Sequence, residues 1–171
     1  EPMEAKAVIV ATGGKHRHLG VKGETELEGK GVSRCATCDG ASFQDKPVAV
    51  IGGGDTALDE ALYLANVASK VSIIHRGENL IASATLMGRA KENPKIEFLA
   101  NTTVEEILGT DGVTALKLSG GNNLLIDGVF IAIGVEPETR LIKDLVQLDP
   151  MGHVSVDLRM QTLIAGVFGV V

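Results

Sequence analysis

The segment VAVIGGGDTALDEALYLANVASKVSIIHR, residues 48–76, constrains the fold more than any other part of the chain. A short apolar run leads into a glycine triplet, residues 55–69 then show helical periodicity, and a second apolar run follows at 70–76. A strand, a glycine turn, a helix and a strand within about 30 residues have the length of a right-handed βαβ crossover. The segment therefore predicts two neighbouring parallel strands in an α/β sheet.

The glycine loop of this segment fits the dinucleotide-binding pattern G-x-G-x-x-A. Gly52 would permit the sharp turn, Gly54 the approach of a diphosphate, and Ala57 close packing of the helix on the strand. The free N–H groups at the helix start, where Asp55 or Thr56 is suited to act as the cap, would face the phosphates. Its place between a predicted strand and a predicted helix favours a nucleotide site over a plain glycine turn. The residues of this predicted site are Gly52, Gly53, Gly54, Asp55, Thr56 and Ala57.

The residues at the end of the second strand indicate which nucleotide is bound. Enzymes that use NAD usually place Asp or Glu there, to bind the ribose 2′-hydroxyl. This chain has His75 and Arg76 instead, and a guanidinium suits a 2′-phosphate. We therefore expect NADPH, with NADH possible because Gly77 and Glu78 add no positive charge. The alternative is a solvated basic pair at a strand end.

The chain has two cysteines, Cys35 and Cys38, in the sequence SRCATCDG. A redox dithiol, inert thiols, a zinc site and a structural disulfide are all open. Zinc would need two further ligands, and a reducing compartment disfavours a structural disulfide. If the pair is redox-active, a flavin is the usual relay from a nicotinamide to sulfur, and Asp39 would supply or hold a proton. A short helix at CATCDG would stabilise the thiolates.

The rest of the chain completes an α/β pattern. Two turn signals, TDG and GGNN, predict a three-stranded antiparallel meander over 104–126. We expect a Rossmann-like open sheet of βαβ units with this meander attached. Further predicted elements are a short buried strand at 7–14, a connector at 15–34 with KHRH as a solvated loop, a helix at 82–92, a strand at 95–100, and a strand-to-glycine run at 128–137.

Composition narrows the function classes. A net charge of −6 argues against nucleic-acid binding, which depends on a basic surface. No apolar run approaches the roughly 18 residues of a membrane span, and the acidic start is unlike a signal peptide, so we expect no membrane partner and a cytoplasmic protein. The first residue is not Met and the last residues, GVFGVV, are apolar without a cap. We interpret the chain as cut from something longer.

Several motifs together resemble bacterial thioredoxin reductase of the low-molecular-weight type. They are CATCDG (35–40), the βαβ segment (48–76), VFIAIGVEPET (129–139), AVIVATGG (7–14) and MQTLIAGVF (160–168). The likeness covers essentially the whole chain. It implies membership of the FAD/NAD(P)-binding domain family, in which an NADPH domain carrying the dithiol is inserted into an FAD domain.

The resemblance implies a division of this chain into three parts. Residues 1–14 and 135–171 would be remnants of the FAD domain, and residues 15–134 the NAD(P)H-binding domain. The full-length parent would be an NADPH-dependent thioredoxin-disulfide reductase, a homodimer that binds FAD. This chain alone would lack most of the flavin site and would be inactive.

The same resemblance implies roles for individual residues. Cys38 would face the flavin, Cys35 would attack the disulfide of thioredoxin or a thioredoxin-like protein, and Asp39 would be the proton donor. Further cofactor-binding positions carried over in this way are Thr12 and Gly13, next to FAD, and Ile133 and Gly134. No metal site is implied.

Three features depart from the family pattern. Gly77 and Ile81 stand where basic residues usually follow the second strand, Glu138 replaces the Asn of a GxxPNT motif, and GVFGVV differs from the usual small-residue run. The first departure weakens the expected preference for NADPH. Two other functions stay open: the reductase component of an alkyl hydroperoxide reductase-type system, and a non-catalytic nucleotide-binding module with incidental cysteines.

Overall fold

A computed structural model describes residues 3–170, which divide into two compact units. Unit 2 is the continuous segment His18–Gly134, and unit 1 combines the chain up to Arg17 with the chain from Val135 onward. Each unit is considered by itself below.

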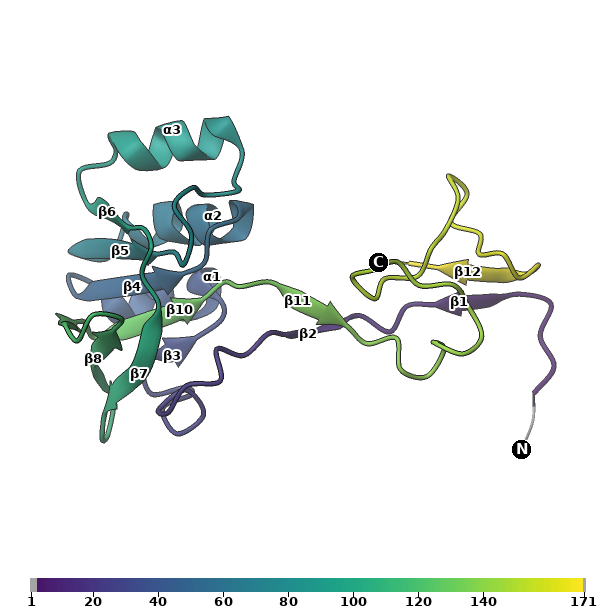
Figure 1. Cartoon of the computed structure of the whole chain (residues 1–171), viewed down its shortest axis with the longest axis horizontal. Helices are drawn as coiled ribbons and strands as arrows, with labels where there is room; N and C mark the ends of the chain where they lie inside the picture. Colours follow the sequence, from purple (N-terminus) through teal and green to yellow (C-terminus); the bar gives the residue numbers. More distant parts are fainter. Residues whose placement is uncertain (1–2, 171) are drawn as a thin grey trace. The chain divides into compact units, whose positions relative to one another are not determined.

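A five-stranded parallel sheet forms the centre of unit 2 (Figure 1). Its strands, in spatial order, are β3 (Val32–Ser33), β10 (Gly128–Ile131), β4 (Pro47–Ile51), β5 (Lys70–Ile74) and β6 (Ile96–Leu99). The pairing of β4 with β5 is parallel, with Val48 opposite Val71. The predicted βαβ unit and the α/β fold class are confirmed.

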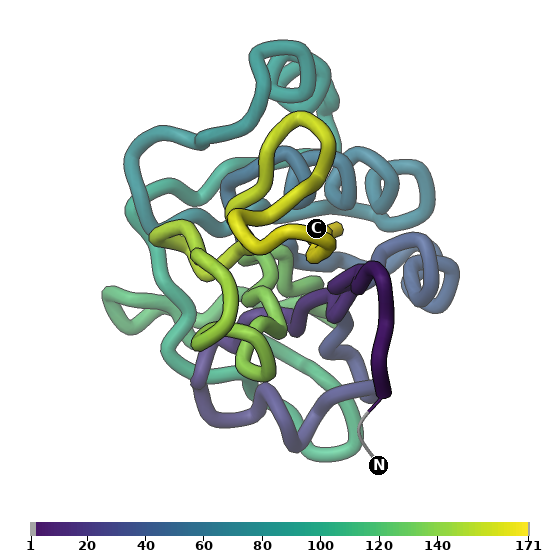
Figure 2. Tube along the Cα trace, turned by 90° about the vertical axis from the view of Figure 1, so that its right-hand side faces the viewer, coloured from purple at the N-terminus to yellow at the C-terminus, as the bar shows by residue number. Residues whose placement is uncertain are grey.

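The alternation of side chains along the strands gives the sheet two buried faces. On β4, Val48 and Val50 join one apolar cluster, whereas Ala49 and Ile51 join the other. Helices α2 (Asp55–Leu64) and α3 (Ala84–Glu92) cover the first face, and both lie above the sheet in Figures 1 and 2. The antiparallel meander covers the second face, and its strands are β7 (Val104–Gly109), β8 (Val113–Leu118) and β9 (Asn123–Leu125).

Helix α2 differs from its prediction at both ends. It ends at Leu64 rather than at residue 69. Just beyond this end, the Asn66 side-chain amide donates to the carbonyls of Leu62 and Tyr63. A side chain that binds these carbonyls competes with the helical backbone, which accounts for the early end. The prediction of an Asp55 or Thr56 cap is wrong: the N-cap is Gly54, and no side chain caps the helix.

Two short helices follow β3. Helix α1 (Ala36–Asp39) is the short helix considered at CATCDG, and a 3₁₀ helix, η1 (Gly40–Phe43), continues it. The chain then enters β4, so the cysteine pair lies between the first two strands of the sheet in sequence.

Unit 1 consists of two small pairs of strands. β1 (Val8–Val10) pairs in parallel with β12 (Val167–Gly169), and β2 (Gly14–His16) pairs antiparallel with β11 (Val135–Pro137). The strand predicted within 7–14 is present as β1, but the prediction that it is buried is wrong, because Val8 is 49% and Ile9 68% exposed. Irregular residues 11–13 separate β1 from β2. With one strand as neighbour, most of β1 keeps its apolar side chains in solvent.

Candidate functional site at the carboxyl edge of the sheet

The five strands of the central sheet in unit 2 all run parallel, so the loops that follow them emerge at one edge of the sheet. The cysteine turn follows β3, Ile133 and Gly134 follow β10, the glycine loop follows β4, and His75 follows β5. Ligands of open α/β sheets bind at this carboxyl edge. One strand, β10, separates β3 from β4 in the sheet. At the usual strand spacing, the cysteine turn and the glycine loop therefore start about 10 Å apart. Of the predicted site residues, Thr12 and Gly13 lie in unit 1 instead.

Gly52 makes the turn at the end of β4. Its φ is +156°, and a Cβ built there would lie 2.2 Å from the Ala132 carbonyl oxygen and 2.9 Å from Cβ of Ala57. Its N–H donates to the Ile74 carbonyl at 3.0 Å. A larger residue at position 52 would therefore push apart β10, α2 and the loop, which supports the interpretation of the turn.

The start of α2 leaves backbone donors available to an anion. The first backbone N–H with an acceptor in this helical turn is that of Leu58, which donates to the Gly54 carbonyl. The N–H groups that precede it have no helical acceptor. A Cβ at Gly54 would meet nothing within 4 Å, so the approach is open. The Asp55 carboxylate accepts from the Ser83 N–H at 2.6 Å, and Asp55 and Thr56 are exposed. This geometry fits a bound diphosphate.

The segment after β5 is bonded to the glycine loop. The Ile81 N–H donates to the Gly53 carbonyl at 2.8 Å, and His75 Nε2 lies 2.7 Å from the Asn79 carbonyl oxygen. Arg76 is exposed, and its guanidinium makes no hydrogen bond or ion pair with any residue that the structure describes. It is thus available to an anionic ligand beside the loop.

A hollow of about 190 Å³ lies next to this segment, where β5 and β6 end below α3. Ile73, Met87 and Phe98 are among the apolar residues that line it, and His75 and Lys91 contribute polar groups. It is roomy and apolar enough for a flat ring.

Cys35 and Cys38 form a disulfide with a Cα–Cα distance of 5.3 Å. Cys35 is the N-cap of α1 and is partly buried, and its sulfur accepts the Cys38 N–H at 3.2 Å. Cys38 and Asp39 are exposed. In residues 3–170 no group of three or more His, Cys, Asp or Glu side chains is placed to hold a metal ion.

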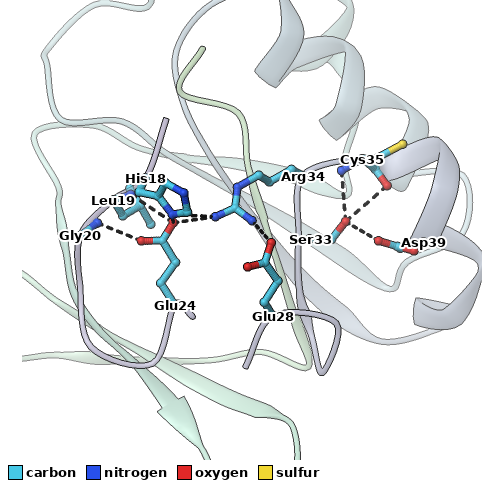
Figure 3. Close-up of polar contacts among 9 residues, drawn as sticks. All are labelled: His18, Leu19, Gly20, Glu24, Glu28, Ser33, Arg34, Cys35 and Asp39. Carbon is cyan, nitrogen blue, oxygen red and sulfur yellow. Dashed lines mark hydrogen bonds and ion pairs between the residues drawn. The ribbon is translucent and has the colours of Figure 1, made fainter. Parts of the chain in front are cut away.

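Two polar residues at the cysteine turn were missed by the sequence analysis. The Ser33 hydroxyl donates to Asp39 Oδ2 at 2.6 Å and accepts the Cys35 N–H at 3.1 Å (Figure 3). Glu60 of α2 lies near the backbone of Ala36 with a buried Oε2 that has no hydrogen-bond partner among the residues that the structure describes, and burial raises the pKa of this carboxyl above its usual value of 4.5. No sequence motif marks Ser33 or Glu60, because tertiary packing and not sequence spacing brings each of them to the cysteine turn.

A buried ion pair lies on the other side of Ser33 (Figure 3). Glu24 is 2% exposed and accepts from Arg34 at 2.9 Å and from the Gly20 N–H at 2.8 Å. His18 Nδ1 lies 3.2 Å from the same carboxylate, and Arg34 also pairs with Glu28. The expectation of a loop at KHRH is wrong for Lys15 and His16, which belong to β2, although both are exposed as expected. His18 lies in an exposed loop as predicted and still contacts Glu24.

The parallel sheet carries a glycine loop of the nucleotide-binding type and a disulfide turn at the same edge. These two features define the class of α/β protein. The chain matches the family model described as pyridine nucleotide-disulphide oxidoreductase over residues 1–170, and it belongs to that family.

Similar proteins include several thioredoxin reductases. The one from Streptomyces coelicolor is 47% identical over 171 residues, covering 96% of this chain and 53% of the relative. The one from Listeria innocua is 45% identical, covering 96% and 54%. The solved structure of Lactococcus lactis thioredoxin reductase is 38% identical with a TM-score of 0.88, covering 96% and 56%. The chain thus spans about half the length of the relatives it matches.

Two predicted FAD-binding residues lie in unit 1. Thr12 and Gly13 are exposed and border a hollow of about 20 Å³, which is far smaller than a flavin. In the part of the chain that the structure describes, no helix is long and apolar enough to cross a bilayer.

Proposed function

We propose that this chain is the NADPH-binding, dithiol-bearing part of a thioredoxin reductase-like flavoprotein. The observation that carries the proposal is the placement of the cysteine turn and the glycine loop one strand apart at the carboxyl edge. The relatives described above bear the name thioredoxin reductase, which favours thioredoxin as the partner over a hydroperoxide-reducing system.

NADPH would lie along this edge. Its diphosphate would bind the open backbone at Gly54 and the first turn of α2, and its 2′-phosphate would bind Arg76. The hollow beyond His75 would take the adenine, which leaves the nicotinamide towards Ile133, Gly134 and the cysteine turn. NADPH would supply the hydride, and the FAD of the whole protein would relay the electron pair.

The cysteines would carry the chemistry that this chain itself performs. Reduction of the disulfide takes two electrons and two protons, and the Asp39 carboxyl would supply one proton to Cys38. The Cys35 thiolate would then attack the disulfide of thioredoxin, and Cys38 would close the mixed disulfide and release reduced thioredoxin. Cys38 would be the sulfur that faces the flavin.

The domain organisation is part of the proposal. Residues 15–134 would be the nucleotide domain, and residues 1–14 and 135–171 would belong to the FAD domain, through which the whole protein would form a cytoplasmic homodimer.

Calorimetric titration of the chain with NADPH and with NADH tests the proposal. We expect both nucleotides to bind, with NADPH the tighter. The control is Gly52→Ala, which should abolish binding of both because the turn cannot close. Failure of the unmodified, folded chain to bind either nucleotide would contradict the proposal.

A further inference from the structure

Ser33 connects the two ends of the cysteine turn, and we infer that it is the positioning residue for Asp39 in the dithiol reaction. The inference rests on the proposed function, because it concerns the proton that moves when the Cys35–Cys38 disulfide opens and closes.

The placement of Ser33 comes from the sheet. Ser33 is the last residue of β3, opposite Phe130 of β10, and is 7% exposed. The backbone at this position is paired with β10, whereas Asp39 lies at the exposed end of a four-residue helix. The buried Ser33 therefore supports the exposed Asp39 carboxylate.

The hydrogen bonds of Ser33 assign its single proton. Its hydroxyl accepts the Cys35 N–H at 3.1 Å, which uses a lone pair. It lies 2.6 Å from Asp39 Oδ2 and 3.4 Å from the Cys35 carbonyl, so the proton goes to the carboxylate (Figure 3). A charge-assisted bond of this length is among the strong ones. It holds the Asp39 carboxylate at the Ser33 hydroxyl, and Asp39 follows Cys38 directly in the sequence.

The step that needs this orientation is closure of a mixed disulfide. The Cys38 thiol gives its proton to the Asp39 carboxylate, and the resulting thiolate attacks the Cys35 sulfur. The new Cys35–Cys38 bond forms as the bond to the partner's sulfur breaks, and that sulfur leaves as a thiolate. A carboxylate free to rotate would accept the proton less often, so closure would slow.

The experiment uses the reduced 171-residue chain and dithionitrobenzoate, an aromatic disulfide that releases a coloured thiolate. Stopped-flow absorbance separates the first release, when Cys35 attacks, from the second, when Cys38 closes the disulfide. We expect Ser33→Ala to slow the second phase about tenfold and the first less than about twofold, since one charge-assisted bond is lost. Asp39→Asn should slow the second phase at least as much.

A double variant separates positioning from a general structural role. If Ser33 acts through Asp39, then Ser33→Ala should add less than about twofold to the effect of Asp39→Asn. Ser33→Thr keeps the hydroxyl and should restore the second phase. Ser72→Ala is the matched control, because Ser72 is a buried strand serine whose hydroxyl donates to Glu97 Oε1 at 2.6 Å, away from the cysteines.

Two outcomes would overturn the inference. One is an unchanged second phase in Ser33→Ala while Asp39→Asn is slow. The other is equal slowing of both phases in Ser33→Ala and Ser72→Ala. Neither outcome affects nucleotide binding, so the titration with NADPH tests the proposed function separately.

Discussion

The imidazole of His75 lies directly against the backbone of Gly53. A Cβ built at Gly53 would lie 2.3 Å from Nδ1 and 2.6 Å from Cε1 of the ring. The ring cannot move aside without loss of the contact between its Nε2 and the Asn79 carbonyl. The strand end that the sequence assigned to nucleotide recognition therefore also sets the shape of the glycine loop.

Gly53→Ala should destabilise the chain by roughly 1–3 kcal/mol, the usual cost of overpacking. Urea unfolding measures this change. Gly54→Ala is the control: its Cβ would enter open space, so the loss should stay below about 1 kcal/mol, the usual cost of Ala at an N-cap. NADPH binding to Gly54→Ala should still weaken, because the methyl group would occupy the diphosphate's approach.

A second change tests whether His75 is the cause. Removal of the ring in Gly53→Ala/His75→Ala should recover most of the stability lost in Gly53→Ala, once the cost of His75→Ala alone is subtracted. Strictly additive losses would show that the ring does not set the cost.

Arg76→Ala should lower NADPH affinity about tenfold or more and leave NADH affinity nearly unchanged. The reason is that only NADPH carries the 2′-phosphate, and a charge-assisted contact is worth about 1.5–3 kcal/mol. Calorimetry at fixed ionic strength measures both constants. Arg89→Ala, which removes an exposed arginine of α3, is the matched control. Equal weakening of both nucleotides would refute this role of Arg76.

Glu60 should make the chain less stable as the pH rises from about 4.5. Burial raises the pKa of Glu60 in the folded chain, so the folded state holds the proton more tightly than the unfolded state. Stability is therefore lost between the unfolded value of 4.5 and the raised folded pKa. Glu60→Gln keeps the shape of the side chain and removes the ionisable group.

Urea midpoints at pH 4 and pH 7 measure the effect of Glu60. The variant Glu60→Gln should be the more stable protein at pH 7 and should match the unmodified chain at pH 4. A variant that is less stable at pH 7 would show that Glu60 is charged and paired in the folded chain.

Glu138 should titrate far below its usual range. Arg140 and Lys15 bind its two carboxylate oxygens and lower the pKa of Glu138 from 4.5 to about 2. Because the folded pKa is depressed, the stabilisation is present above pH 4.5 and is lost as the pH falls towards 2. Carboxyl-carbon NMR of the chain measures the pKa.

The partners of Glu138 provide the controls. Arg140→Ala and Lys15→Ala should each raise the pKa of Glu138, and high salt should do the same, since these charges are near the surface. A pKa near 4.5 in the unmodified chain would contradict the ion pairs.

The sequence predicted those features that depend on local spacing. The glycine triplet after VAVI and the apolar residues of 55–64 indicated the βαβ unit, and TDG and GGNN located the meander turns. Burial of Ile9 was predicted wrongly, because burial depends on which elements cover a strand and not on the strand itself.

The missed residues share one physical property: each acts across the fold. Ser33 reaches Asp39 only because β3 ends beside α1, and Glu60 reaches Ala36 from α2. Glu24 and Arg34, ten residues apart, both lie in the segment 15–34 that the sequence analysis treated as a connector. Such contacts follow from tertiary packing, which the periodicity of apolar residues in the sequence does not predict.

The pairing of β2 with β11 has a consequence for engineering. His16 lies opposite Val135, so the chain enters and leaves the segment between them at adjacent points. A segment whose ends meet can be exchanged as a cassette: residues 18–134 of a homologue could replace those of this chain through two neighbouring splice points. The nucleotide preference and the cysteine chemistry would travel together in that single exchange.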